Sequence, residues 1–266
     1  MEIPFSRWHA AIPLRRSRRR YDSAALEPDQ LDQLRTVCGE FRPFPQARAE
    51  LVTESPDRIF RGAVGPYGKI KGATALIAFI GDMDDPYVQE KVGYIGEAVI
   101  LEAMSMGLAT CWVGGFFRPK VAASVVGVGK NERVLAVTPV GRAVENVTRE
   151  ERIMTGFGRN HRRKPLAELV TGVAQSDWPQ WVKPALEAAR IAPSAINRQP
   201  WRFYIESNGI TVSVDNSRFS FGVSKRLDCG IAMLHIEVAA LDAGVQGRWE
   251  FLEAPGVARF AVESGG

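Results

Sequence analysis

The sequence has 266 residues, of which 45% are hydrophobic and 24% are charged, as in ordinary globular proteins with a large core. Its net charge is +4, and much of the basic excess lies in two clusters, at residues 15–20 and 159–164. Two compact clusters favour a discrete anionic ligand over a continuous nucleic-acid surface. No apolar run approaches the roughly 20 residues that a membrane-spanning helix needs, so we expect no membrane association.

The alternation of apolar and polar residues predicts an α+β fold. Helices are predicted at residues 5–14, from 28 onwards, and at 84–107, 120–126, 166–170, 182–191 and 227–243. Strands are predicted at 49–53, 73–80, 110–113 and 134–140, near 203 and 212, and at 249–252 and 258–262. The nearly continuous apolar run at 73–80 suits a buried strand. Residues 57–71 are predicted to be irregular.

The cysteines and histidines do not form a recognisable site. Cys38, Cys111 and Cys229 lack metal-ligand spacing and cannot all pair, so we expect reduced thiols and a cytoplasmic protein. The three histidines are scattered, and His235 falls on a predicted buried helix. We therefore expect no metal site and no histidine-based catalytic group.

The two long predicted helices are related by an internal repeat. Gly93 and Gly230 are 137 residues apart (230 − 93), and the same offset relates a further set of residues. These pairs are Ala103 with Ala240, Gly107 with Gly244, and Trp112 with Trp249. Earlier in each half, Pro28 matches Pro179 at a spacing of 151 residues instead of 137. A difference in loop length between the two halves accounts for this change of spacing. We predict two related α+β halves, residues 1–172 and 173–266.

Residues 191–202 read Ile-Ala-Pro-Ser-Ala-Ile-Asn-Arg-Gln-Pro-Trp-Arg. Pro193 is expected to stop the preceding helix, and Pro200 to force an extended exit into a strand. The small and amide residues between them let a flat ligand approach the backbone and offer short hydrogen bonds. For any one of these residues, an ordinary polar loop is the alternative.

The whole string resembles the flavin-contacting loop of the nitroreductase family, whose pattern is roughly Ala-Pro-Ser-Ala-x-Asn-x-Gln-Pro-Trp. The resemblance implies an FMN-dependent oxidoreductase of nitroreductase-like fold, with Pro193, Ser194, Ala195 and Asn197 at the flavin. Family members are usually homodimers whose flavin sites are built from both subunits. The internal repeat then implies a monomer that acts as a pseudo-dimer.

Residues 15–21 read Arg-Arg-Ser-Arg-Arg-Arg-Tyr and resemble the family's N-terminal signature, roughly Arg-Arg-Ser-x-Arg-x-Phe. The resemblance implies that Arg15, Arg16, Ser17 and Arg19 bind the flavin's phosphate and ribityl chain. Arginine forks match phosphate oxygens, and charge-assisted hydrogen bonds contribute about 1.5–3 kcal/mol each. A solvated basic arm is the alternative.

Residues 162–166, Arg-Arg-Lys-Pro-Leu, resemble the family's terminal Arg-Lys-x-Leu segment. The resemblance implies that Arg163 and Lys164 return to the same phosphate, with a solvated turn as the alternative. Both basic segments lie in the first half, whereas the amide-bearing loop lies in the second. In a family dimer, the two kinds of segment at one site come from different subunits. We therefore predict one flavin per chain and a degenerate second pocket.

Residues 112–116, Trp-Val-Gly-Gly-Phe, resemble the family segment whose backbone lies over the flavin ring. Gly114 and Gly115 would permit that approach, because a side chain there would hit the ring. A tight turn after a strand is the alternative. Lys69 or Lys71 lies where the family often has a basic residue near the pyrimidine edge, and a cation there would stabilise reduced flavin.

The expected reaction is a ping-pong cycle in which NADH or NADPH reduces FMN and a small organic acceptor, such as a nitroaromatic or a quinone, reoxidises it. The flavin carries this chemistry, so no catalytic side chain is required. Two alternatives remain open. One is a specialised flavin enzyme for dehalogenation or flavin breakdown. The other is a non-catalytic protein that binds nucleotide or nucleic acid through its basic N-terminal arm.

Overall fold

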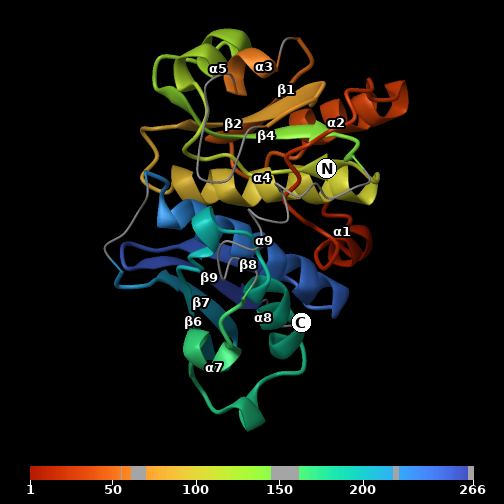
Figure 1. Cartoon of the computed structure of the whole chain (residues 1–266). Coiled ribbons are helices and arrows are strands. Elements are labelled where there is room, and N and C mark those ends of the chain that lie inside the picture. Colours follow the sequence, from red (N-terminus) through yellow and green to blue (C-terminus); the bar gives the residue numbers. More distant parts are fainter. Residues whose placement is uncertain (55, 61–69, 145–161, 218–221, 263–266) are drawn as a thin grey trace.

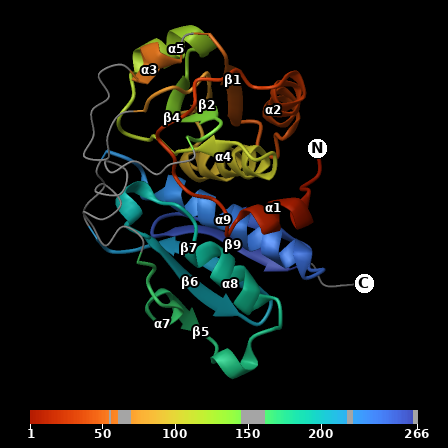
Figure 2. The ribbon, with the colours of Figure 1, turned by 45° about the vertical axis from the view of Figure 1, so that its right-hand side comes forward.

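The computed structural model describes residues 1–54, 56–60, 70–144, 162–217 and 222–262. Two sheets enclose a central layer in which the long helices α4 (Val88–Ser105) and α9 (Lys225–Asp242) lie side by side (Figures 1 and 2). The short helix α1 (Phe5–Ala11) packs against both of them. In the part of the chain that the structure describes, no helix is both long and apolar enough to cross a membrane.

The first sheet is antiparallel and has the order β1-β2-β4-β3. Its strands are β1 (Ala47–Val52), β2 (Ala75–Asp82), β3 (Ala109–Thr110) and β4 (Glu132–Gly141). The accompanying helices are α2 (Pro28–Glu40), α3 (Asp57–Phe60) and α5 (Pro119–Val126). Strand β2 is the predicted buried strand, and it is covered on both faces. Successive side chains of β2 point to opposite faces of the sheet. Ile77 and Phe79 pack on the face toward α4, and the residues that alternate with them pack in the cluster formed with α3 and α5.

Helix α3 corrects the prediction that residues 57–71 are wholly irregular. Ile59 and Phe60 are buried in the same cluster as residues of β2 and α5. This burial stabilises a four-residue helix that is too short to show a periodic pattern in the sequence. Residues 61–69 lie outside the described part of the chain.

The second sheet has the order β5-β6-β7-β9-β8, with β5 parallel to β6 and every other pair antiparallel. Its strands are β5 (Val170–Gly172), β6 (Trp201–Glu206), β7 (Gly209–Val214), β8 (Gly247–Phe251) and β9 (Gly256–Val262). The helical segments are α7 (Leu166–Leu169), α8 (Val182–Arg190) and the 3-10 turns η1 (Gln175–Asp177) and η2 (Ala195–Asn197). Because β5 belongs to this sheet, the sheet begins before the predicted boundary at residue 172. The division into two halves stays a prediction.

Helices α4 and α9 cross with their backbones in contact at two glycines. A side-chain carbon on Gly93 would overlap the carbonyl oxygen of Leu227, and one on Gly230 would overlap that of Glu90. The contact is reciprocal, since each glycine meets the residue three positions before the other glycine. Such symmetry is typical of a contact between two equivalent helices, as the repeat predicts.

We expect Gly93→Ala and Gly230→Ala each to lower the free energy of unfolding by about 2 kcal/mol or more, because the added methyl group forces the two backbones apart. Urea unfolding followed by circular dichroism measures this change. Gly39→Ala on α2 is the matched control, since a side-chain carbon there would meet nothing within 4 Å. Wild-type stability in the Gly93 variant would contradict the close crossing.

Candidate functional site

The N-terminal arginine segment lies along the edge of the first sheet. After α1, Ser17 forms a bridge with Thr110 of β3, and the Arg18 amide donates to the Thr110 carbonyl at 2.9 Å. Further on, Arg20 forms a bridge with Lys71, whose amide donates to the Arg19 carbonyl at 3.0 Å. Backbone hydrogen bonds therefore hold the segment in an extended conformation, and the arginine side chains do not take part in these bonds.

Arg15 differs from its neighbours because it is buried, with 7% of its surface exposed. Its Nε lies 3.9 Å from Oε1 of Glu97, beyond hydrogen-bond distance. Its buried Nη1 has no hydrogen-bond partner among the described residues. Burial lowers the pKa of Arg15, while the charge of Glu97 acts in the opposite direction. A buried guanidinium with an unused donor is suited to receive an anion.

Arg16 and Arg19 occupy more accessible positions than Arg15. The exposed Arg16 donates from Nη1 to the carbonyls of Pro13 and Arg15, at 2.8 Å each. Arg19 is partly buried. The structure therefore separates the predicted phosphate-binding residues into one that is buried and others that lie nearer the surface.

The loop after α8 is held in an unusual backbone conformation. Helix α8 ends at Arg190, and the buried Pro193 follows, as predicted. Ile196, Asn197 and Gln199 have φ values of 50°, 57° and 49°, in the left-handed region that disfavours a β-branched residue such as isoleucine. Backbone strain of this kind concentrates at functional sites and persists only where the surroundings impose it.

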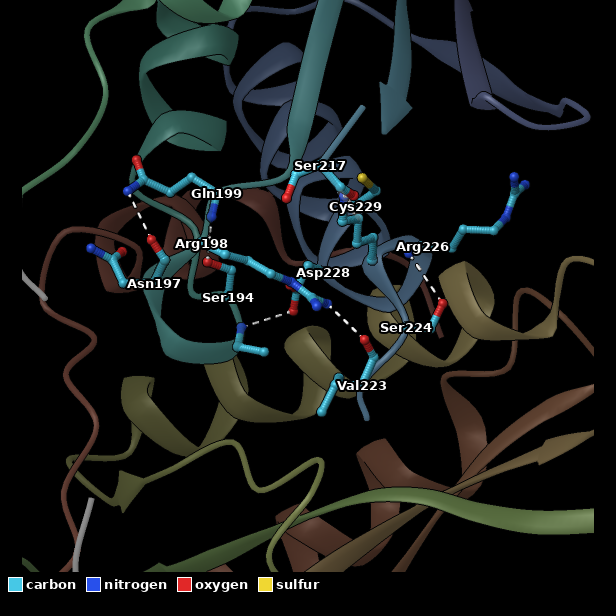
Figure 3. A network of polar contacts seen from close by, with 12 residues as sticks. Ser194, Asn197, Arg198, Gln199, Ser217, Val223, Ser224, Arg226, Asp228 and Cys229 are labelled. Carbon is cyan, nitrogen blue, oxygen red and sulfur yellow. Dashed lines mark hydrogen bonds and ion pairs between the residues drawn. The ribbon is translucent and has the colours of Figure 1, made fainter. Parts of the chain in front are cut away.

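Hydrogen bonds from α9 and from within the loop impose this conformation (Figure 3). Ser194 Oγ accepts from the Gln199 amide at 3.0 Å. Asp228 on α9 accepts from the Ala195 amide at 3.1 Å and from Arg198 Nε at 2.7 Å. Burial raises the pKa of Asp228 to about 6, outweighing the opposite effect of Arg198. Asp228 therefore connects the loop to the central helix layer.

The second basic segment binds this loop directly. Arg163 Nη1 donates to Asn197 Oδ1 at 2.6 Å, and Nη2 donates to the Ile191 carbonyl at 2.9 Å. The Lys164 amide donates to Gln199 Oε1 at 2.8 Å, and its Nζ donates to the Gln199 carbonyl at 3.1 Å. The second basic segment and the loop, which the sequence analysis treated as separate candidates, thus bind each other.

Arg163 also lies close to the N-terminal arginines. Burial, and after it the positive charge of Arg15, lowers the pKa of Arg163 to about 10, and Arg190 and Arg16 act in the same direction. Arg163 stays protonated at neutral pH, so the structure gathers several positive charges from both basic segments beside the loop. A bound anion would relieve their mutual repulsion.

The predicted ring-end glycines follow β3 and face the segment that leads into α9. A side-chain carbon on Gly114 would lie 3.0 Å from Cγ2 of Val223, while Gly115 is exposed. The Val223 carbonyl in turn accepts from Arg198 Nη2 at 3.0 Å (Figure 3). Gly114 and the amide-bearing loop therefore contact the same short segment. Lys69 lies outside the described residues, and Lys71 is exposed.

Aromatic side chains occupy the position related to this site by the repeat. Phe251 stands 137 residues after Gly114 (251 − 114), and its ring stacks on Tyr87 with a centroid separation of 5.6 Å. Phe44 packs edge-on against Phe251 at 5.3 Å. Lys91 Nζ, at the position that corresponds to Asp228, lies 4.8 Å from the centre of the Phe251 ring. The counterpart position is thus filled by side chains of this chain.

Several polar residues of the site escaped the sequence analysis. Arg198 occupies a free position of the loop pattern, yet its pairing with Asp228 holds the loop. The buried Glu97 bonds to His235, 138 residues away along the chain. His235 is buried, as predicted. No local pattern identifies these pairs, because only the packing of α4, α8 and α9 brings their members together.

We expect Asp228→Ala to lower the free energy of unfolding by about 3 kcal/mol, because it removes the carboxylate that balances the buried positive charge of Arg198. Urea unfolding at pH 7.5 measures the loss. Asp32→Ala is the control, since Asp32 forms an exposed ion pair with Arg35 and is expected to contribute about 0.5 kcal/mol or less. Equal losses in both variants would contradict a structural role for Asp228 in the loop.

The fold is similar to those of known nitroreductase-type proteins. A family model described as "Putative TM nitroreductase" matches residues 8–240. The structure of a "putative nitroreductase" from Thermotoga maritima is similar with a TM-score of 0.64 and 17% identity, covering 96% of this chain and 93% of that chain. The family match and this likeness confirm the predicted α+β fold of nitroreductase type.

Two shorter structures are less similar. A nitroreductase family protein from Clostridium difficile 630 has a TM-score of 0.44 and 20% identity, covering 61% of this chain and 94% of its own. A nitroreductase with bound FMN from Bacteroides fragilis NCTC 9343 has a TM-score of 0.41 and 18% identity, covering 53% of this chain and 90% of its own. A comparison with curated protein sequences finds no match.

Proposed function

We propose that this chain, which belongs to the nitroreductase family whose model matches residues 8–240, is an FMN-dependent oxidoreductase. It would transfer reducing equivalents from NADH or NADPH to a small organic acceptor such as a nitroaromatic or a quinone. The observation that carries this proposal is the buried Nη1 of Arg15 without a hydrogen-bond partner among the described residues, together with Arg163 bound to the strained loop through Asn197. The family supplies the type of reaction, and these residues supply a site for an anionic cofactor.

The arginines fit the phosphate of FMN. Arg15 presents a buried Nη1 without a partner among the described residues, and Arg163 is held on the loop by Asn197. A phosphate carries up to two negative charges and three acceptor oxygens, which match several guanidinium donors at once. Binding would also offset the repulsion that lowers the pKa of Arg163. In this proposal, Ser17 and Arg19 lie along the ribityl side of the phosphate.

Gly114 and the loop fit the other end of the cofactor. Gly114 lies against Val223, where a side-chain carbon would come within 3.0 Å, and in this proposal its backbone lies beside the flavin ring. The amide groups of the loop at residues 194–199 are oriented by the left-handed conformation, which in turn is held by Asp228 and Arg198. These residues would bind and orient the cofactor and exclude water from one side of it.

FMN, when bound, supplies the redox chemistry, taking a hydride from the reduced nicotinamide and passing electrons to the acceptor in a ping-pong cycle. The chain's own residues contribute binding and electrostatics. The positive charges of Arg15 and Arg163 would hold the phosphate, and Lys69 or Lys71 would place a cation near the ring's pyrimidine edge.

The filled counterpart position supports one flavin per chain. Phe251 stands where the repeat would place a second glycine, and its ring packs against Phe44 and Tyr87. A second flavin would have to displace these rings and their buried area, at a cost of several kcal/mol. We infer a monomer that acts as a pseudo-dimer with a single cofactor site.

Protein reconstituted with FMN is expected to show flavin absorbance and to oxidise NADH or NADPH when given a quinone. We expect Arg15→Ala to raise the FMN dissociation constant about tenfold or more, because one charge-assisted interaction is lost, and Ser17→Ala to raise it less. Isothermal titration measures both constants.

Arg35→Ala serves as the control, because Arg35 is exposed on α2 and pairs only with Asp32 among the described residues. Wild-type affinity in both Arg15→Ala and Ser17→Ala would remove these residues from the site. A colourless protein that binds DNA or RNA with steep salt dependence would instead favour the nucleic-acid alternative.

Saturating FMN titration is expected to give one flavin per chain, because aromatic rings fill the counterpart position. The ratio is obtained from flavin absorbance after gel filtration and an independent determination of protein concentration. Sedimentation of the same sample gives the assembly state. Two bound flavins per chain would contradict the degenerate second pocket while leaving the redox proposal intact.

A further inference from the structure

A buried carboxylate on α4 connects the two ends of the proposed cofactor site. Glu97 has no exposed surface, and its two oxygens face groups from three separate segments. Oε1 lies 3.0 Å from His235 Nε2 on α9 and 3.9 Å from Nε of Arg15. Oε2 accepts a hydrogen bond of 2.7 Å from the Trp112 indole nitrogen. Arg15 belongs to the phosphate end, and Trp112 stands two residues before Gly114 at the ring end.

Trp112 is fixed against α4 by packing as well as by this hydrogen bond. A side-chain carbon on Gly96 would overlap the Trp112 ring, so the indole occupies the space that a larger residue would fill. The same ring lies 4.8 Å from that of Phe79 on β2. Because the indole has little freedom, its bond to Glu97 sets the position of the backbone that follows it.

The hydrogen bonds of His235 influence the Glu97 carboxylate and, through it, Arg15. His235 Nδ1 lies 2.8 Å from the Ala188 carbonyl, which can only accept, so Nδ1 carries a proton. The bond between Nε2 and Glu97 then needs a second proton, held by one partner or the other. Ala188 lies near the C-terminus of α8, where the helix dipole favours a cation. The hydrogen bond to His235 therefore draws on the same oxygen of Glu97 that faces Arg15.

The Glu97 carboxylate attracts Arg15 without occupying its hydrogen-bond donors. Glu97 is near enough to orient the guanidinium but does not form a hydrogen bond with it, since 3.9 Å exceeds bonding distance. The orphaned Nη1 of Arg15 is thus available to an anion. A fully ionised carboxylate without His235 would attract Arg15 more strongly and compete with that anion.

We propose that Glu97 is a positioning residue that holds Arg15 and Trp112, and with them the phosphate end and the ring end of the flavin site, in fixed relation. This inference rests on the proposed function, because it concerns how the same site is held. Burial of a carboxylate is unfavourable unless its partners compensate, and here the partners come from both ends of the site.

The test compares FMN with riboflavin, which lacks the phosphate. Glu97→Gln is expected to raise the FMN dissociation constant about tenfold and to reduce the preference for FMN over riboflavin, because Arg15 loses its orientation. In an Arg15→Ala background, Glu97→Gln is expected to leave that preference unchanged. A purely structural role for Glu97 would weaken both flavins equally in either background.

Glu237→Gln is the matched control. Glu237 on α9 accepts hydrogen bonds of 2.6 Å from the indole nitrogen of Trp249 and from the Tyr94 hydroxyl, on the side of the filled counterpart position. Trp249 corresponds to Trp112 in the repeat. We expect this variant to bind FMN as the wild type does. Equal weakening by Glu97→Gln and Glu237→Gln would overturn the proposal.

Trp112→Phe provides a second test that does not alter the buried charge. It removes the indole N–H and should weaken FMN and riboflavin by the same factor, because the phosphate end is untouched. If Glu97→Gln does not fold, this variant decides, and wild-type affinity for both flavins would overturn the proposal. A wild-type protein that binds neither flavin would instead refute the proposed function itself.

Discussion

The close crossing of α4 and α9 at Gly93 and Gly230 is the constraint on which the rest of the structure depends. Since neither position carries a side chain, the two backbones meet, and each helix can cover one sheet with its outer face. The same contact places the N-terminal segment and Glu97 against α8, α9 and the loop between α8 and β6. A wider helix spacing would separate the two groups of polar residues that form the candidate site.

The two sides of this crossing have different chemistry despite their similar geometry. On one side, Gly114 packs closely against Val223, and Asp228 binds the amide of a strained loop. On the other side, the corresponding positions hold Phe251 and Lys91, whose side chains pack together in the core. One side thus places charged groups beside a strained loop, whereas aromatic rings and Lys91 pack together on the other.

Several buried polar and charged groups lie around the candidate site, while Glu90, Lys91 and Glu102 are buried at other positions of α4. Arg15, Glu97, Asp228 and His235 are all buried, although burial of each charged group is unfavourable by itself. Hydrogen bonds join α4, α9 and the loop, and the ion pair of 3.9 Å between Glu97 and Arg15 adds the N-terminal segment.

The sequence by itself determined the features whose causes are local. The proline that ends α8, the amide-rich loop, the glycine-bearing long helices and the apolar strand β2 all depend on neighbouring residues. The nitroreductase-type fold was expected from the resemblance of the loop to that family, which the family model confirms. Only the tertiary structure decided that Arg198 pairs with Asp228, that Glu97 bonds to His235 and that Phe251 fills the counterpart position. It also decided the short helix α3, which depends on burial. Such contacts join residues far apart in the chain, and their energies exist only after packing has excluded water from around them.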